Sequence, residues 1–169
     1  RLADQRKQAA LQGLRQRRTH KILGLLPLVQ AQGCSKMSTE IQDDYCVLMW
    51  LDSQEPGPVG VDILQGSVAG ACIPAPGREG PNEDCTFAAS YGPDAIVLAV
   101  ADGAGGMPAG HRASSTAMQA LSDSLHDSRK ESLLLRTAVM NGIEAAQQSV
   151  LDLANGSATT LTIVAVDQD

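Results

Sequence analysis

One aspartate, Asp102, stands where an apolar run meets a glycine-rich turn. The run covers residues 95–101, and Gly103, Gly105 and Gly106 follow the aspartate. Glycine has no Cβ, so the backbone there can turn sharply and bring its carbonyl and amide groups close to a ligand. Carboxylate and backbone carbonyl oxygens are the ligands that Mg²⁺ and Mn²⁺ take. The stretch therefore suits a hard divalent cation, and the alternative is an ordinary Asp-Gly turn.

An arginine and two further carboxylates occur together earlier in the chain. The segment 74–84, PAPGREGPNED, contains prolines and glycines that interrupt regular structure. Arg78, Glu83 and Asp84 should therefore lie on or beside a loop, where functional side chains are common. A guanidinium can bind two phosphate oxygens at once, and the alternative is an ordinary surface arginine.

Runs rich in β-branched residues predict strands on both sides of this loop. We expect two short strands within 59–73, with a turn near Gly66 to Gly70. Further strands are expected at 85–89, 95–101 and 158–166. The run 95–101 is continuously apolar, so it should be buried on both faces.

Two segments, 113–126 and 131–154, have the spacing of amphipathic helices. The buried face of the first should hold Ala113, Ala117, Met118, Leu121 and Leu125. The buried face of the second should hold Leu134, Ala138, Ile143, Ala146, Val150 and Leu153. Asn141-Gly142 could break or bend the second helix, and Asn155-Gly156 should end it.

Composition and charge limit the classes of function. The 169 residues are 43% hydrophobic and 19% charged, which is typical of one globular domain. Residues 37–169 carry five Lys and Arg against eighteen Asp and Glu, so this part suits cations and does not suit nucleic acid. Aromatic residues, which would stack on bases, make up only 2% of the chain.

The cysteines and the hydropathy bear on location. Cys34, Cys46, Cys72 and Cys85 form no C-x-x-C pair, so we interpret them as thiols in a reducing, cytoplasmic compartment. No run approaches the roughly 18 apolar residues of a membrane-spanning helix, so we expect no membrane association.

Residues 1–58 are interpreted as a basic N-terminal extension and linker, and residues 59–169 as the main domain. The segment 53–60, SQEPGPVG, contains two prolines and two glycines, which favours a boundary there. Residues 1–36 carry eight Lys and Arg against one Asp. Three interpretations of them stay open: a solvated basic helix, an export signal ending at a lipid-modified Cys34, and untranslated sequence before a start at Met37.

Four short motifs occur in an order that resembles one family. They are Arg78 with Asn82-Glu83-Asp84, then Val100 to Gly106, then Ala109-Gly110 with Ala113-Ser114, and finally Thr159-Thr160-Leu161. Together they resemble the metal-dependent protein serine/threonine phosphatases of type 2C, in their bacterial form, over roughly residues 59–169. The similarity is to the N-terminal part of the catalytic domain. It implies an α/β fold of the layered α+β kind, an antiparallel β-sandwich flanked by helices and truncated at the C-terminus.

The resemblance also implies a site for two divalent cations, Mn²⁺ or Mg²⁺. Asp102 would bridge the cations and the Gly103 carbonyl would ligate one of them. Glu83 and Asp84 would support the cluster directly or through water, and Arg78 would hold the substrate phosphate. The implied reaction is hydrolysis of phosphoserine or phosphothreonine by a metal-activated water, without a nucleophilic side chain. The implied enzyme is a monomer in signal transduction, and its substrate is a protein phosphorylated by a serine/threonine kinase.

The chain departs from the family pattern in three ways. Arg78 lies six residues before Asp84 instead of five, with Pro81 inserted. Ala104 stands where some relatives have histidine, and we interpret the nearby His111 as a helix-start residue. The later Gly-Asp-Ser-Arg type motif and further aspartate ligands do not occur before Asp169, so we expect this chain alone to be inactive.

Two other classes of function stay open. A catalytically silent phosphoprotein-binding or regulatory module, a pseudophosphatase, would need fewer metal ligands. A nucleotide-binding module would use Gly103 to Gly110 to hold phosphates at a helix start. The second is weakened because neither G-x-x-x-x-G-K-[ST] nor G-x-G-x-x-G is present.

Overall fold

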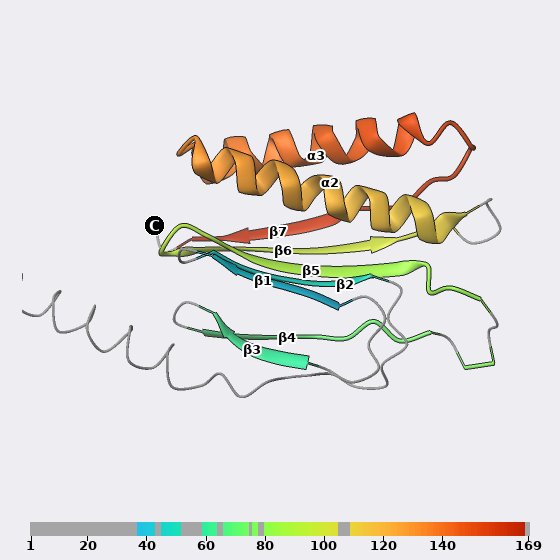
Figure 1. Ribbon diagram of the computed structural model, residues 1–169, viewed down its shortest axis with the longest axis horizontal. Helices are drawn as coiled ribbons and strands as arrows, with labels where there is room; N and C mark the ends of the chain where they lie inside the picture. The colour runs from blue at the N-terminus through green and yellow to red at the C-terminus, as the bar shows by residue number, and fades with distance from the viewer. Residues whose placement is uncertain are drawn as a thin grey trace, which may run out of the picture. The chain divides into compact units, whose positions relative to one another are not determined.

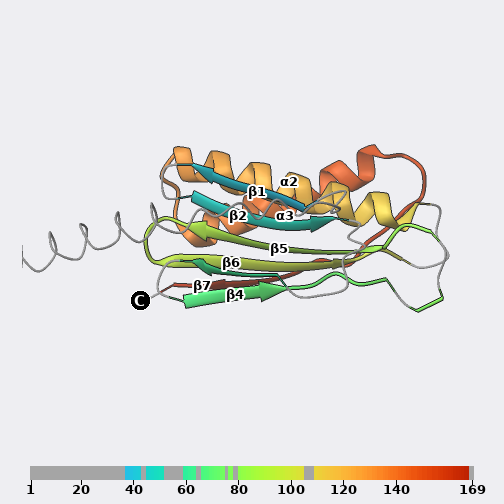
Figure 2. The same cartoon turned by 60° about the horizontal axis from the view of Figure 1, so that its bottom comes forward.

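The computed structural model describes residues 37–42, 45–51, 59–63, 66–74, 76–77, 80–104 and 109–167. The described strands and helices are β1 (Met37–Gln42), β2 (Tyr45–Leu51), β3 (Val59–Ile63), β4 (Gly66–Gly70), β5 (Asp84–Tyr91), β6 (Ala95–Asp102), α2 (Gly110–Lys130), α3 (Leu135–Asp152) and β7 (Thr162–Val166). Five strands form one antiparallel sheet in the order β1-β2-β5-β6-β7 (Figures 1 and 2). Strands β3 and β4 form a separate antiparallel pair. The expected α+β class with antiparallel sheets and flanking helices is confirmed.

Each face of the five-stranded sheet has its own core. The larger core lies between the sheet and the helices, with α2 against β5 and β6 and α3 beside α2 (Figure 1). Its buried residues include Val47, Met49, Cys85, Phe87, Val97, Ala99, Met118, Leu121 and Leu125. The smaller core lies on the opposite face, and Val68 of β4 packs there on Leu48, Trp50, Cys72 and Ala88. Successive side chains of a strand point to opposite faces, so the same strands supply both cores.

The strand predictions differ from the structure in three places. β6 is buried on one face only, because the β3–β4 pair covers just part of the other and Val100 is 51% exposed. The turn expected at Gly66 to Gly70 is wrong, since these residues form β4 and pair with β3. β7 begins at Thr162 instead of 158, because Ala158, Thr159 and Thr160 bond to the residues at and just after the end of β6. The strand expected at 85–89 is confirmed within β5.

Both helices are confirmed, the first with all of its predicted buried face and the second with only part of it. All five residues expected inside α2 are buried. In α3, Ala138 and Ala146 are buried as expected, whereas Ile143 is 37% exposed. Leu134, the residue before the helix, is 78% exposed. The buried stripe of α3 is narrow because it consists of the small residues Ala138, Gly142 and Ala146.

Gly142 does not break α3, which is continuous from Leu135 to Asp152. A Cβ at Gly142 would lie 2.6 Å from Leu121 Cδ1 of α2. The glycine therefore permits the close approach of the two helices instead of bending one of them.

Two strands of the sheet, β1 and β2, lie before Val59 in the chain, whereas the sequence predicted that the domain starts at Val59. β2 pairs with β5 from Val47↔Ala89 to Leu51↔Cys85, and the side chains of Val47–Trp50 are only 2–3% exposed. These strands belong to the compact unit Cys34–Asp169. The proline- and glycine-rich segment thus connects two parts of one unit. Residues 1–36, with the three interpretations given for them, lie outside the described residues.

Neither α2 nor α3, the two helices described, has an apolar stretch that could span a lipid bilayer.

Candidate active site

Asp84 and Asp102 lie opposite each other where β5 begins and β6 ends. The Gly103 amide donates a hydrogen bond of 3.0 Å to the Glu83 carbonyl, so the aspartates form a pair without hydrogen bonds between them. In such pairs the Cα atoms are about 4.5 Å apart and the side chains lie close together. Both aspartates are exposed, and they share the sheet face of Ala88 and Leu98. Like charges placed directly opposite repel each other, and a cation between them would relieve that repulsion.

The backbone of Asp102 is held by Thr159 and Thr160. The Thr160 amide donates to the Asp102 carbonyl at 2.8 Å, and the Thr159 hydroxyl donates to the same oxygen at 2.9 Å. In return, the Asp102 amide donates to the Thr160 hydroxyl at 3.2 Å. Further along β6, the hydrogen bonds on this side come from β7; those of Asp102 come instead from Thr159 and Thr160. Asp102 is therefore fixed although it is the last residue of its strand.

The Glu83 side chain lies at the start of α2. A Cβ at Gly110, the first residue of α2, would come within 3.2 Å of Glu83 Oε1. An anion near the N-terminus of a helix is favoured by the helix dipole, and the first turn of α2 has no acidic residue of its own. Glu83 thus lies on the helix side of the sheet, whereas Asp84 lies on the side of β3 and β4.

Two glycines, Gly103 and Gly110, allow the acidic stretch 83–84, the end of β6 and the start of α2 to lie close together. A Cβ at Gly103 would overlap the Gly110 carbonyl and lie 2.9 Å from the Glu83 carbonyl oxygen. Ala109 precedes the helix in a left-handed conformation with φ 61°. Gly103 is thus required by the close approach of three backbone segments.

The structure brings together four of the five predicted site residues, namely Glu83, Asp84, Asp102 and Gly103. Arg78, Gly105 and Gly106 lie outside the described residues. His111 is the second residue of α2, as predicted, and its carbonyl accepts hydrogen bonds from the hydroxyls of Ser114 and Ser115.

Two residues beside this site were not assigned a role by sequence reasoning. Cys72 was interpreted as an ordinary thiol, and Asn82 only as part of a motif. Both hydrogen-bond to the backbone of Asp84. Asn82 is 6% exposed, and its place next to Glu83-Asp84 was the one available signal.

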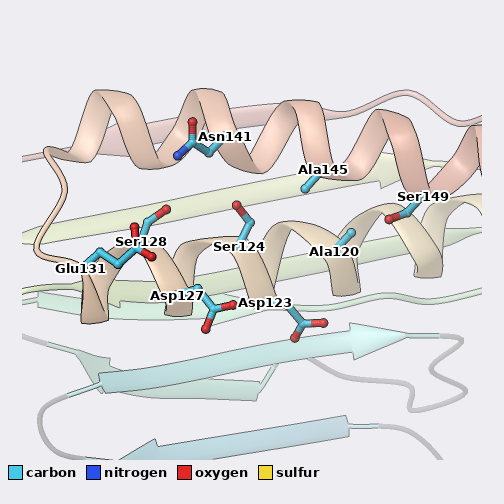
Figure 3. Close-up of a pocket in the computed structure, with 9 residues that line it drawn as sticks. All are labelled: Ala120, Asp123, Ser124, Asp127, Ser128, Glu131, Asn141, Ala145 and Ser149. Atoms are coloured by element: carbon cyan, nitrogen blue, oxygen red, sulfur yellow. The ribbon is translucent and has the colours of Figure 1, made fainter.

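A concave area lies between α2 and α3, away from these residues (Figure 3). It has a volume of about 470 Å³ and is lined by Ala120, Asp123, Ser124, Asp127, Ser128, Glu131, Asn141, Ala145 and Ser149. Two of its carboxylates already have partners: Gln119 donates to Asp123 at 3.0 Å, and Lys130 forms a salt bridge with Asp127 at 3.2 Å. The site at the end of β6 lies instead at the N-terminus of α2.

The donor atoms at the aspartate pair match the preference of Mg²⁺ and Mn²⁺ for oxygen. Asp84 and Asp102 offer exposed carboxylates. Within the part of the chain that the structure describes, no three or more His, Cys, Asp or Glu are grouped closely enough to hold a metal ion. The described residues therefore match a hard cation in the type of their donor atoms, but they do not by themselves form a complete ligand set.

The fold and this site define an antiparallel α+β protein with an acidic, oxygen-lined site at the end of a strand pair. A profile of the protein phosphatase 2C family matches residues 77–169, more than half of the chain and all of the predicted site. The chain belongs to the protein phosphatase 2C family. No curated protein and no solved structure shows significant similarity to it.

Proposed function

We propose that the protein is a serine/threonine phosphatase that uses divalent cations at the Asp84–Asp102 pair. Membership of the phosphatase family supports hydrolysis of a phosphoric ester in general. The observation that carries the finer proposal is the pairing of two exposed carboxylates at the end of β5 and β6. The proposed substrate is a protein phosphorylated by a serine/threonine kinase.

Each residue of the site has a proposed role. Asp102 and Asp84 would hold Mn²⁺ or Mg²⁺, with the Gly103 carbonyl as a further ligand and Glu83 acting directly or through water. Two such cations, when bound, neutralise the phosphate ester and supply a water of lowered pKa. Arg78 would hold the phosphate oxygens through its guanidinium.

The backbone contacts of Asp102 support this proposal because they fix the position of Asp102 before a cation binds. Thr159 and Thr160 hold the amide and the carbonyl of Asp102 through three hydrogen bonds. A carboxylate on a fixed backbone loses little freedom when it takes up a ligand. The exposure of both aspartates leaves them accessible to a side chain of another protein.

The decisive test is Asp102→Asn in the full-length protein, assayed on phosphoserine and phosphotyrosine peptides with Mn²⁺. Asparagine keeps the shape of the side chain and removes its charge, so we expect kcat/KM for phosphoserine to fall at least about 100-fold. Chelation should abolish the wild-type activity, and added Mn²⁺ or Mg²⁺ should restore it.

The matched control is Asp94→Asn, because Asp94 is an exposed carboxylate in the turn at the other end of the same strand pair. This variant should keep wild-type activity. A folded Asp102→Asn protein with normal activity would refute the proposal. A wild-type protein that binds phosphoserine peptide without hydrolysing it would indicate the non-catalytic module instead.

A further inference from the structure

Among the described residues, Asp84 is paired in the sheet with Asp102 of β6. It pairs with Asp102 without hydrogen bonds between the two residues, so its own amide and carbonyl point to the β2 side. The described pairing of β2 with β5 ends one residue further along, at Leu51↔Cys85. Hydrogen-bond partners for these two groups can therefore also come from side chains outside the sheet.

Cys72 and Asn82 supply these partners. The Cys72 thiol donates to the Asp84 carbonyl at 2.8 Å, and the Asp84 amide donates to Asn82 Oδ1 at 3.2 Å. Asn82 Nδ2 donates in turn to Cys72 Sγ at 3.0 Å. Both backbone groups of Asp84 are thus bound by two side chains that also bind each other. We name this pair of side chains the Cys72–Asn82 bracket.

The bracket is anchored in the protein interior. Cys72 is 4% exposed and packs with Leu48, Trp50 and Ala88 in the smaller core, and Asn82 is 6% exposed. Movement of either side chain would have to disturb this packing. The bracket consequently fixes Asp84 relative to the sheet, as Thr159 and Thr160 fix Asp102 from the opposite side.

We propose that Cys72 and Asn82 are positioning residues that set the distance between the carboxylates of Asp84 and Asp102. This inference rests on the proposed function in one respect, the metal ion that the two carboxylates would hold. Outer partners of metal ligands commonly change metal affinity by about 10- to 100-fold when they are removed. The thiol acts here as a hydrogen-bond donor, so a hydroxyl can replace it.

The test compares Cys72→Ala, Cys72→Ser and Cys46→Ala in the full-length protein. Alanine removes the donor and serine keeps one. Cys46 is a matched control because it is a half-buried cysteine packed against the same smaller core. Two readouts are taken: Mn²⁺ affinity by calorimetric titration, and amide hydrogen exchange at Asp84 and Cys85. Thermal melting identifies any variant that fails to fold, and Asn82→Ala then takes its place.

We expect Cys72→Ala to weaken Mn²⁺ binding about tenfold and to speed exchange at the Asp84 amide. Cys72→Ser should stay within about threefold of wild type, and Cys46→Ala should match wild type in both readouts. Unchanged affinity and exchange in Cys72→Ala would overturn the proposal. An equal loss in Cys46→Ala would also overturn it, because the effect would then be a general loosening of the core.

Failure of the proposed function gives a different result. If the wild-type protein binds no Mn²⁺, the metal site is refuted and amide exchange alone decides the inference. Faster exchange at Asp84 in Cys72→Ala, with protection kept in Cys72→Ser and Cys46→Ala, would support the bracket. Equal protection in all three variants would refute it.

Discussion

Gly103 is the residue of the site with the least room for change. Its Cα faces the Gly110 carbonyl and the Glu83 carbonyl, which are both backbone groups and cannot rotate away. The glycine thus determines how closely α2 approaches the acidic stretch. The sequence suggested that Gly103 serves a sharp turn. The structure shows a stronger reason, the close packing of backbone atoms of Glu83 and Gly110 against it.

We therefore expect Gly103→Ala to lower the free energy of unfolding by about 3 kcal/mol, the upper part of the range for overpacking. Gly66→Ala is the control, because a Cβ at Gly66 would meet no atom within 4 Å. That variant should stay within about 0.5 kcal/mol of wild type. Urea denaturation followed by circular dichroism measures both, and equal stability of the two variants would contradict the packing argument.

Among the elements, β5 is tied to the connection between α2 and α3 by one side chain. The Tyr91 hydroxyl, at the end of β5, donates a hydrogen bond of 2.7 Å to the Leu133 carbonyl. Burial raises the pKa of Tyr91 above its usual value of 10.0, and the nearby Arg129 opposes part of this rise. Because the folded pKa is the higher one, the stabilising effect of the hydroxyl is complete below pH 10.0 and is lost as the pH rises through the folded pKa.

Tyr91→Phe should accordingly lower the free energy of unfolding by about 1 kcal/mol at pH 7, the usual net value of one hydrogen bond. The difference from wild type should shrink above pH 10.0, where the hydroxyl ionises in the unfolded chain while it is still protonated in the folded one. Denaturant unfolding of both proteins at several pH values measures this. A difference that stays constant into the alkaline range would show that the hydroxyl contributes only by packing.

The elements also show what the sequence can and cannot predict. The four-residue spacing of Ala113, Ala117, Leu121 and Leu125 predicted the buried face of α2, since that helix lies directly on the sheet. α3 lies beside α2, and there small residues such as Gly142 matter more than large ones. The exposure of Ile143 in α3, and of Leu134 just before it, shows that hydrophobicity alone did not predict this face correctly.

Long-range pairing explains the other differences. β2 and β5 pair although a segment rich in proline and glycine lies between them in the sequence. The composition of that segment alone predicted a domain boundary there. The sequence could suggest Asp84 and Asp102 as site residues because each lies in a recognisable motif. Nothing in the sequence indicated the hydrogen bond from Cys72 to Asp84, because the two residues are twelve positions apart.

At the scale of the whole molecule, β7 lies at one edge of the five-stranded sheet that the described strands form. β7 pairs with β6 and with no other described strand. Val100, Val164 and Val166, on the face toward β3 and β4, are 50–54% exposed. An uncovered edge strand with apolar side chains favours association between molecules.

We expect the 169-residue chain to self-associate through β7 at high concentration. Val164→Lys should reduce this association, because lysine on an edge strand discourages pairing with another chain. Gln147→Lys adds the same charge on the exposed side of α3 and is the control. Sedimentation velocity measures both variants. Equal behaviour of the two would assign the effect to net charge instead of to β7.

Because Trp50 lies against Gly70, tryptophan fluorescence can report on this contact without an added label. The chain has one tryptophan, Trp50 is 2% exposed, and a Cβ at Gly70 would lie 2.8 Å from its ring. Indole emission therefore reports on a single place, the contact between the five-stranded sheet and the β3–β4 pair. Fluorescence and helical circular dichroism recorded on one sample can thus separate the undocking of that pair from the unfolding of the helices.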